Sequence, residues 1–255
     1  MSAHDDQWQG RANRWLGGGG GIAFGVLTLA GWAAWARPAL FKTLNTAPDV
    51  GAPGSAITRY YVEHATSARI GALLGTIALL PMLAFVVSMF NRLRTAERGT
   101  HPFSTLALLG GVMVCVEHFL FCGFLFQAAF APRAVGPEVT EAWHWAYAAG
   151  GAAFITYTTF LLAVGIVALR YGALSRRIGI SALVIAPLQV LYLPSAFAHL
   201  GIFDPLSGAL GVYVPFGGFL AWCIAAGVAL GRTDVPAAAE GSVRLAPGKP
   251  ARIPT

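Results

Sequence analysis

The residues best suited to chemistry occur together between Cys115 and Cys122, in the middle of a long apolar run that also contains Glu117 and His118. On a helix, Cys115, His118 and Cys122 share one stripe because they are three and four residues apart, while Glu117 points about 100° away. A carboxyl group at the bilayer centre costs about 3 kcal/mol unless it is protonated or paired. The segment therefore predicts a polar site inside a membrane, with Glu117 and His118 as the candidate catalytic residues.

Three explanations of this segment remain open from the residues alone. Glu117 and His118 can be neutral groups that form hydrogen bonds to polar side chains on neighbouring helices. They can instead bind or relay a proton or a polar ligand. Imidazole and thiolate also suit zinc or copper, and His118 with Cys122 can share an ion, although two ligands do not make a site. Thr156, Tyr157, Gln189 and Tyr192 are the candidate ligand-binding residues, and Thr158 and Thr159 are further possible hydrogen-bond partners.

His144 and His199 form a second candidate site, because they are expected at similar depths in the fourth and fifth apolar runs. Two imidazoles at equal depth on facing helices are what a bis-histidine haem needs. The alternative is that His144 is an interfacial anchor beside Trp143 and Trp145. No cofactor is predicted. Haem, or a metal held by His144, His199, His118 or Cys122, is the alternative.

The composition excludes several classes of protein. Of the 255 residues, 56% are hydrophobic and only 11% are charged, which is less than half the usual charged share of a soluble domain. A soluble enzyme is therefore excluded. The 17 basic residues lie singly or in small groups between apolar runs, which argues against nucleic-acid binding. Lys42 and Lys249 fall outside those runs, so no buried lysine could carry retinal as a Schiff base.

Six apolar runs are long enough to cross the hydrocarbon core, which takes about 20 residues each. The predicted fold is an all-α, polytopic transmembrane helix bundle with six spans. The expected organisation is a cytoplasmic N-terminal segment at residues 1–16, a membrane domain at 17–230 and a disordered cytoplasmic tail at 231–255. Within the membrane domain, an irregular outer loop at 37–69 is expected to hold one short helix near Ile57 to Ser67. The predicted spans are Gly17 to Ala36, Ile70 to Phe90, Ser104 to Ala131, Trp145 to Leu169, Ile178 to Leu200 and Leu206 to Leu230.

Lysine and arginine are more frequent in the connections on the side of the two termini than in the alternate ones. This asymmetry predicts a bacterial inner-membrane protein with both termini in the cytoplasm. Arg11 and Arg14 before an apolar stretch also imitate a secretory signal, but the stretch is longer than a signal core of about 7–15 residues. We therefore expect it to be a membrane anchor.

Glycines and prolines within the runs also carry information. Gly17, Gly21 and Gly25 are four residues apart, as are Gly71 with Gly75 and Gly227 with Gly231, a spacing that favours close helix packing over phosphate binding. Pro187 and Pro194 interrupt the fifth run, and Pro215 interrupts the sixth. Such interruptions are either simple kinks or breaks that open a cavity near the midplane.

Three pieces of the chain together resemble a known family. They are Arg69-Ile70-Gly71 opening a span that ends in Asn91-Arg92-Leu93-Arg94, the mid-span Glu117-His118, and the connection from Ala168 to Gly179. Over residues 65–230 the chain resembles a broad group of uncharacterised bacterial six-helix membrane proteins, grouped as a domain of unknown function. The resemblance implies six helices, and it implies no reaction, ligand or catalytic residue.

Three functional classes follow from these observations, and the sequence leaves open whether the protein is an enzyme. The first is a non-enzymatic bundle, transporter-like or a partner subunit, with a buried proton- or ligand-binding site at Glu117 and His118. The second is a membrane enzyme acting on a lipidic or isoprenoid substrate, with Glu117 as the general acid. The third is a haem or metal redox subunit. The expected partners are membrane lipid and a second copy or another membrane subunit, with no nucleic acid. For the enzyme, the aromatic residues expected to line an apolar cavity are Phe119, Phe121, Phe124 and Phe126.

Overall fold

The computed structural model describes residues 11–12, 14–36, 47–48, 51–97, 99–130, 137–196, 201–203 and 209–232, and it contains helices and no strand in these ranges. Six helical segments are long and apolar enough to cross a membrane, which confirms the six-span fold. The predicted tail lies outside the described residues after Arg232, as does most of the N-terminal segment. The elements are η1 (Trp15–Gly19), α2 (Gly20–Ala36), α3 (Gly54–Ala96), α4 (Pro102–Phe130), α5 (Pro137–Tyr171), α6 (Arg176–Leu188), η3 (Gln189–Ala196), η4 (Gly201–Phe203), η5 (Ala209–Gly217) and α7 (Gly218–Arg232).

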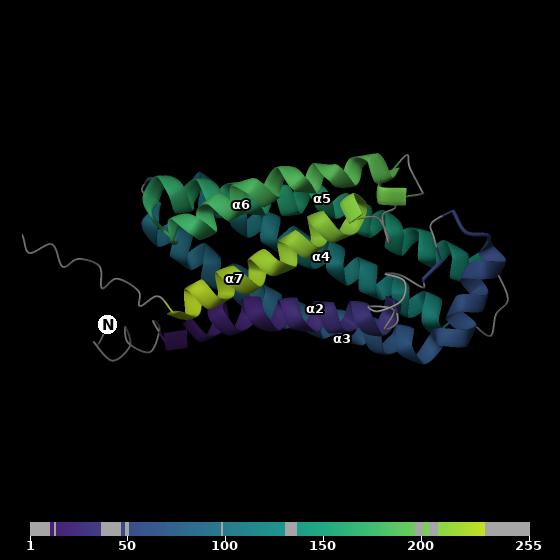
Figure 1. The fold of residues 1–255 in the computed structure, drawn as a ribbon. Coiled ribbons are helices and arrows are strands. Elements are labelled where there is room, and N and C mark those ends of the chain that lie inside the picture. The colour runs from purple at the N-terminus through teal and green to yellow at the C-terminus, as the bar shows by residue number, and fades with distance from the viewer. Residues whose placement is uncertain are drawn as a thin grey trace, which may run out of the picture.

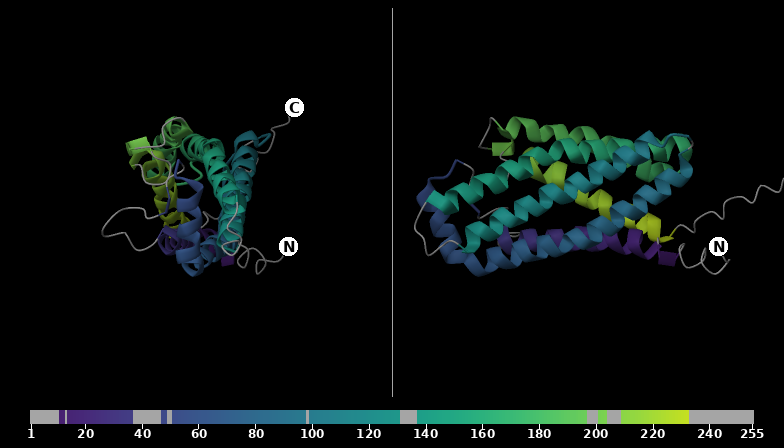
Figure 2. Two further views of the ribbon diagram at one scale, coloured as in Figure 1. Left: turned by 90° about the vertical axis from the view of Figure 1, so that its right-hand side faces the viewer. Right: turned by 180° about the vertical axis from the view of Figure 1, so that it is seen from behind.

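The long helices follow the long axis of the bundle, α7 crosses it obliquely, and the first and last spans are neighbours (Figures 1 and 2). Along the chain, α2 packs on α3, α3 on α4, α4 on α5 and α5 on α6, and α7 then packs on both α6 and α2. The start of η1 and the end of α7 lie at the same end of the bundle, which we call the terminal end (Figure 1). Large apolar side chains such as Leu80, Leu109 and Val184 are exposed on the outside of the bundle, as expected for a surface that faces lipid.

The second span is longer than predicted, because α3 begins at Gly54. Half of the expected outer loop at 37–69 is therefore helical, and the helix expected near Ile57 to Ser67 is part of α3. Its first part bends away from the rest at His64, where φ is −121° and ψ is 19°, and crosses the end of the bundle opposite the termini (Figure 1). Exposed Arg59 and Glu63 lower the hydropathy of this segment, whereas Ile57 and other residues on its opposite face are buried.

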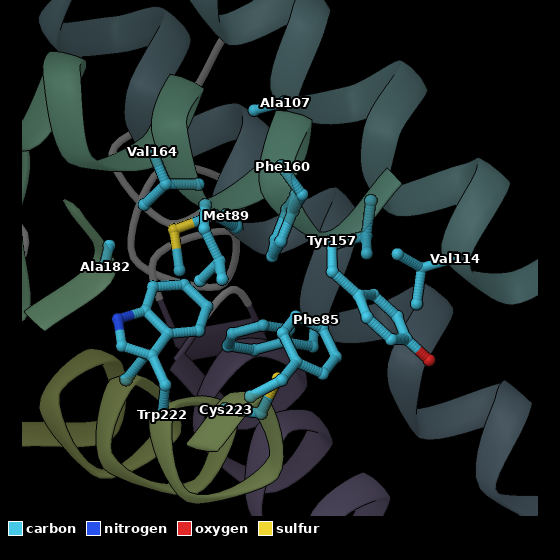
Figure 3. Close-up of a cluster of buried hydrophobic side chains, with 14 of the residues drawn as sticks. Phe85, Met89, Ala107, Val114, Tyr157, Phe160, Val164, Ala182, Trp222 and Cys223 are labelled. Atoms are coloured by element: carbon cyan, nitrogen blue, oxygen red, sulfur yellow. The ribbon is translucent and has the colours of Figure 1, made fainter. Parts of the chain in front are cut away.

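The interior consists of two apolar cores. The terminal core contains Phe85, Met89, Phe160 and Trp222 and lies between α3, α4, α5, α6 and α7 (Figure 3). Tyr157 stands at its edge, with its hydroxyl directed away from Trp222 (Figure 3). The opposite core is built by the ends of α2, α3, α4 and α5; it includes Trp35, Ile57, Tyr61, Leu125 and Trp143.

Glycines let the helix backbones touch, as their spacing predicted. A Cβ atom on Gly21 would lie 2.6 Å from the Cys223 carbonyl oxygen in α7, and one on Gly71 would lie 2.6 Å from the Gly31 carbonyl oxygen in α2. Real Cβ atoms do not approach so closely, so any side chain at these positions requires the helices to separate. The prediction of close packing is confirmed at these glycines.

The start of α4 is fixed by a carboxyl group that was not singled out in the sequence. Glu97 accepts hydrogen bonds from the backbone N–H groups of Phe103 (3.0 Å) and Ser104 (2.7 Å), two of the free donors in the first turn. Between them the chain turns at His101, whose φ is 54°. Burial of the Glu97 carboxyl raises its pKa, but these N–H groups, the Ser104 hydroxyl and nearby His101 together hold the pKa below its usual value. Ionised Glu97 therefore anchors the helix that carries Glu117.

Candidate ligand-binding cavity

A cavity lies near the middle of the bundle, where the two apolar cores meet. It encloses about 950 Å³ of empty space, part of which is open to the outside. Its lining includes Tyr157 of the terminal core and Trp35 of the opposite core. The part of this space that a water-sized molecule can occupy measures about 120 Å³. An apolar cavity of about 150 Å³ binds benzene, so this one suits a ligand group of about that size.

Five of the six candidate site residues line this cavity, although they come from three separate elements. Glu117 and His118 are contributed by α4, Tyr157 by α5, and Gln189 and Tyr192 by η3. The sixth candidate, Thr156, contacts Glu117 directly. Residues far apart in the sequence are thus brought to one place.

Glu117 is buried near the middle of α4 and is paired with α5. The Thr156 hydroxyl oxygen lies 2.5 Å from Glu117 Oε2 and 2.9 Å from the Ala153 carbonyl oxygen. A hydroxyl carries one proton and can donate only one strong hydrogen bond. Both contacts are satisfied together when Glu117 is protonated and donates to Thr156, which in turn donates to Ala153. The geometry therefore suits a neutral carboxylic acid, one of the alternatives that the sequence left open.

His118 differs from Glu117 because no side chain in the described residues is hydrogen-bonded to its Nε2, and the ring lies instead beside the backbone of Gly75 in α3. Its Nε2 is buried and makes no hydrogen bond within the described residues. The ring packs edge-on against Phe24 of α2, with centroids 5.8 Å apart. A Cβ atom on Gly75 of α3 would lie 3.4 Å from Nε2 and 2.6 Å from Cys122 Sγ, so glycine is needed for α3 to approach here. The histidine thus lies at a three-helix junction on the cavity wall.

The fifth and sixth spans change their helical form beside the cavity. The fifth span passes from α6 into the 3-10 helix η3 directly after Pro187, and the sixth begins as the π-helix η5, which contains Pro215. The two are joined by Gln189, whose Nε2 donates to the Pro215 carbonyl oxygen at 2.9 Å. Gln189 and Pro215 both line the cavity. These proline breaks therefore border the cavity, which agrees with the second of the two interpretations of these prolines, breaks that open a cavity.

Three lining residues carry buried polar atoms with no hydrogen-bond partner among the described residues. These atoms are Thr28 Oγ1, His118 Nε2 and Gln189 Oε1, on side chains that are 4%, 7% and 0% exposed. Buried polar groups are usually satisfied, because an unmade hydrogen bond costs about 1–3 kcal/mol. Three such atoms around one cavity point to a polar ligand group. Thr28 was missed in the sequence because a threonine in an apolar helix ordinarily bonds its own backbone.

Aromatic rings supply much of the cavity wall, but most are not the ones expected. Of the four expected phenylalanines only Phe121 lines the cavity. Phe119 is exposed on the outside, while Phe124 stacks on Trp145 and Phe126 on Phe130. The reason is that adjacent positions on α4 face different neighbours, and the sequence alone did not fix which face looks inward. The other aromatic lining residues are Trp32, Trp35, Tyr147, Phe154, Tyr157, Tyr192 and Phe216.

The metal and haem candidates are not brought together in the part of the chain that the structure describes. No group of three or more histidine, cysteine, aspartate or glutamate side chains there could hold a metal ion. His144 is exposed near the start of α5, and its proposed partner His199 lies outside the described residues. His118 and Cys122 do share the cavity wall, but within the described residues no third such ligand joins them.

Comparisons with protein-family models, with curated proteins and with solved structures found no match.

Proposed function

We propose that this chain is a non-enzymatic bacterial inner-membrane protein, with both termini cytoplasmic, that binds a ligand at Glu117 and His118 in a transporter-like manner. The observation that carries the proposal is the central cavity, which combines a buried acid with three buried polar atoms that have no hydrogen-bond partner in the part of the chain that the structure describes. The helix breaks after Pro187 and at Pro215 support it, because interrupted helices near the midplane are typical of substrate sites in transporters. The family resemblance remains part of the proposal.

Retention of small molecules by the purified protein tests the binding function. Ala153 lines the cavity, whereas its neighbour Ala152 is exposed on the same helix. We expect Ala153→Phe to fill part of the cavity, and Ala152→Phe to leave the cavity unchanged. Full-length wild type and both variants are purified in mild detergent and denatured, and the released molecules are identified by mass spectrometry. A molecule present in wild type and Ala152→Phe but lost from Ala153→Phe supports the proposal. Identical sets from all three proteins contradict it.

Acid catalysis on a lipidic or isoprenoid substrate is the second candidate function. It is favoured by the contacts of Thr156, which suit a protonated Glu117 that could donate to a substrate. The same retention experiment separates the two functions, because an enzyme would release a molecule in two forms, substrate and product. Glu117→Gln would then leave only the substrate form.

A further inference from the structure

We propose that the ligand is a protonated hydrophobic amine, which enters the cavity in exchange for the proton on Glu117. This inference rests on the proposed function and specifies its substrate class. It follows from three properties of the cavity: the kind of polar atom left open, the aromatic walls, and the distribution of charge.

The open polar atoms favour a ligand that donates hydrogen bonds. Gln189 already uses its amide nitrogen as a donor to Pro215, which leaves Oε1, an atom that can only accept. Ionised Glu117 also only accepts, and Thr28 and neutral His118 can each accept. An ammonium group offers up to three donors and no acceptor, so it matches this set of atoms.

The walls favour a positive charge on an apolar body. Indole and phenol rings carry negative potential on their faces, and a cation within about 6 Å of a ring centroid is attracted to it. Trp32 lines the cavity, and its ring centroid lies 5.2 Å from that of Tyr213 and 5.8 Å from that of Phe216, which also lines the cavity. On another wall, Tyr157 stacks on Phe219 at 4.4 Å. Among aromatic residues, tryptophan binds cations best.

The charged groups that line the cavity favour a cationic ligand. Its described lining contains no lysine, arginine or aspartate, and Glu117 is its one carboxyl group. The other titratable groups that face it are His118 and Cys122 from α4, Tyr147 and Tyr157 from α5, and Tyr192 from η3. No titratable side chain in the described lining comes from α2, α3 or η5. An anionic ligand would meet Glu117 with no compensating positive charge.

The exchange conserves charge within the membrane. Before binding, Glu117 is a neutral acid that donates to Thr156. When the ammonium group enters, the carboxyl O–H bond breaks, its proton leaves to water, and the carboxylate pairs with the ammonium while the Thr156 hydroxyl donates to the carboxylate. One proton leaves for each amine bound, so an isolated charge, which costs about 3 kcal/mol at the bilayer centre, is not created.

Three probes with the same phenyl ring and two-carbon chain but different charge test this proposal: phenethylamine, phenethyl alcohol and phenylacetate. Binding to the full-length protein in detergent is measured by calorimetry at neutral pH, in two buffers of different ionisation enthalpy, which report the protons released. We expect the amine to bind about tenfold or more tightly than the alcohol, in line with cation–aromatic attraction and pairing with Glu117, and to release one proton. Phenylacetate should bind least.

Glu117→Gln is compared with Glu63→Gln, the same change at an exposed residue of α3. Glu117→Gln should reduce amine affinity about tenfold or more and abolish proton release, because the pairing carboxylate is gone, while alcohol affinity, which needs no charge, should fall much less and reports that the cavity is intact. Glu63→Gln should behave as wild type. Equal binding of amine and alcohol, or amine binding that survives Glu117→Gln, overturns the cation proposal while the binding function stands. If none of the three probes binds, the cation proposal also fails, and the retention experiment decides the binding function separately.

Discussion

Replacing Gly71 by alanine should separate α2 from α3 and destabilise the bundle. The new Cβ atom would lie 2.6 Å from the Gly31 carbonyl oxygen and 2.6 Å from Trp35 Cβ, and neither atom can rotate away, because both belong to or adjoin the backbone of α2. Since carbon atoms pack best at about 3.5–4.0 Å, the helices must move apart by about 1 Å. Overpacking of this kind costs about 1–3 kcal/mol.

Gly123→Ala provides the matched control, because nothing lies within 4 Å of the Cβ position at Gly123 in α4. Alanine there should be neutral or stabilise the helix by up to about 1 kcal/mol, because glycine is the poorer helix former. The two variants should therefore differ by about 2 kcal/mol or more, which corresponds to about 4–8 °C in the unfolding midpoint.

The assay can use the protein's own cysteines. Cys115, Cys122 and Cys223 are free and buried, so a thiol-reactive fluorophore added to the protein in detergent reports their exposure on heating. If the Gly71→Ala and Gly123→Ala proteins unfold at the same temperature, the close contact between α2 and α3 is not what holds this part of the bundle together.

Three further predictions concern hydrogen bonds that hold the cavity in place. The pKa of Glu97 is lowered in the folded protein, so the stability that its carboxylate contributes is present above the unfolded pKa of about 4.3 and is lost as pH falls through the folded pKa. Thermal unfolding midpoints measured from neutral to acid pH should therefore fall less steeply for Glu97→Gln than for wild type. Gln189→Leu should destabilise the protein by about 1–3 kcal/mol, because the Pro215 carbonyl loses its donor; a midpoint equal to wild type would contradict this role. Thr156→Val should also destabilise the protein by about 1–3 kcal/mol, because Glu117 loses its hydrogen-bond partner. Thr159→Val is the control and should lower the unfolding midpoint less, because the Thr159 hydroxyl bonds only the Ile155 carbonyl of its own helix.

The spans were predictable because crossing hydrocarbon requires a long apolar helix, a property that sequence displays directly. The start of α3 was not predictable, because Arg59 and Glu63 are typical of an exposed loop. Only the structure shows that Ile57, on the other face of this segment, packs into the opposite core. Such a stretch becomes helical because a distant segment, here the start of α5, buries one of its faces. The local sequence carries no information about that packing.

The candidate residues of the cavity were partly predictable for a related reason. A carboxyl group within a span needs a partner, so Glu117 drew attention to the polar residues of other spans, and Thr156 and Gln189 are among them. The rotation of α4 was not predictable, because that helix is apolar all round and its residues give no inward face. The same is true of the apolar spans that contain Trp32 and Phe216, so these two residues were overlooked, although both line the cavity.

The contact between the first and last spans sets an order for assembly. Gly18 in η1 meets Gly227 in α7, where a Cβ atom would lie 2.9 Å from the Gly18 carbonyl oxygen, and Trp32 of α2 packs on Tyr213 of η5. During synthesis α2 is made before α7, so the side of α2 that packs on α7 faces lipid until α7 has been inserted. The bundle is then closed by α7, and the cavity at its centre acquires its last wall only after this helix has been inserted.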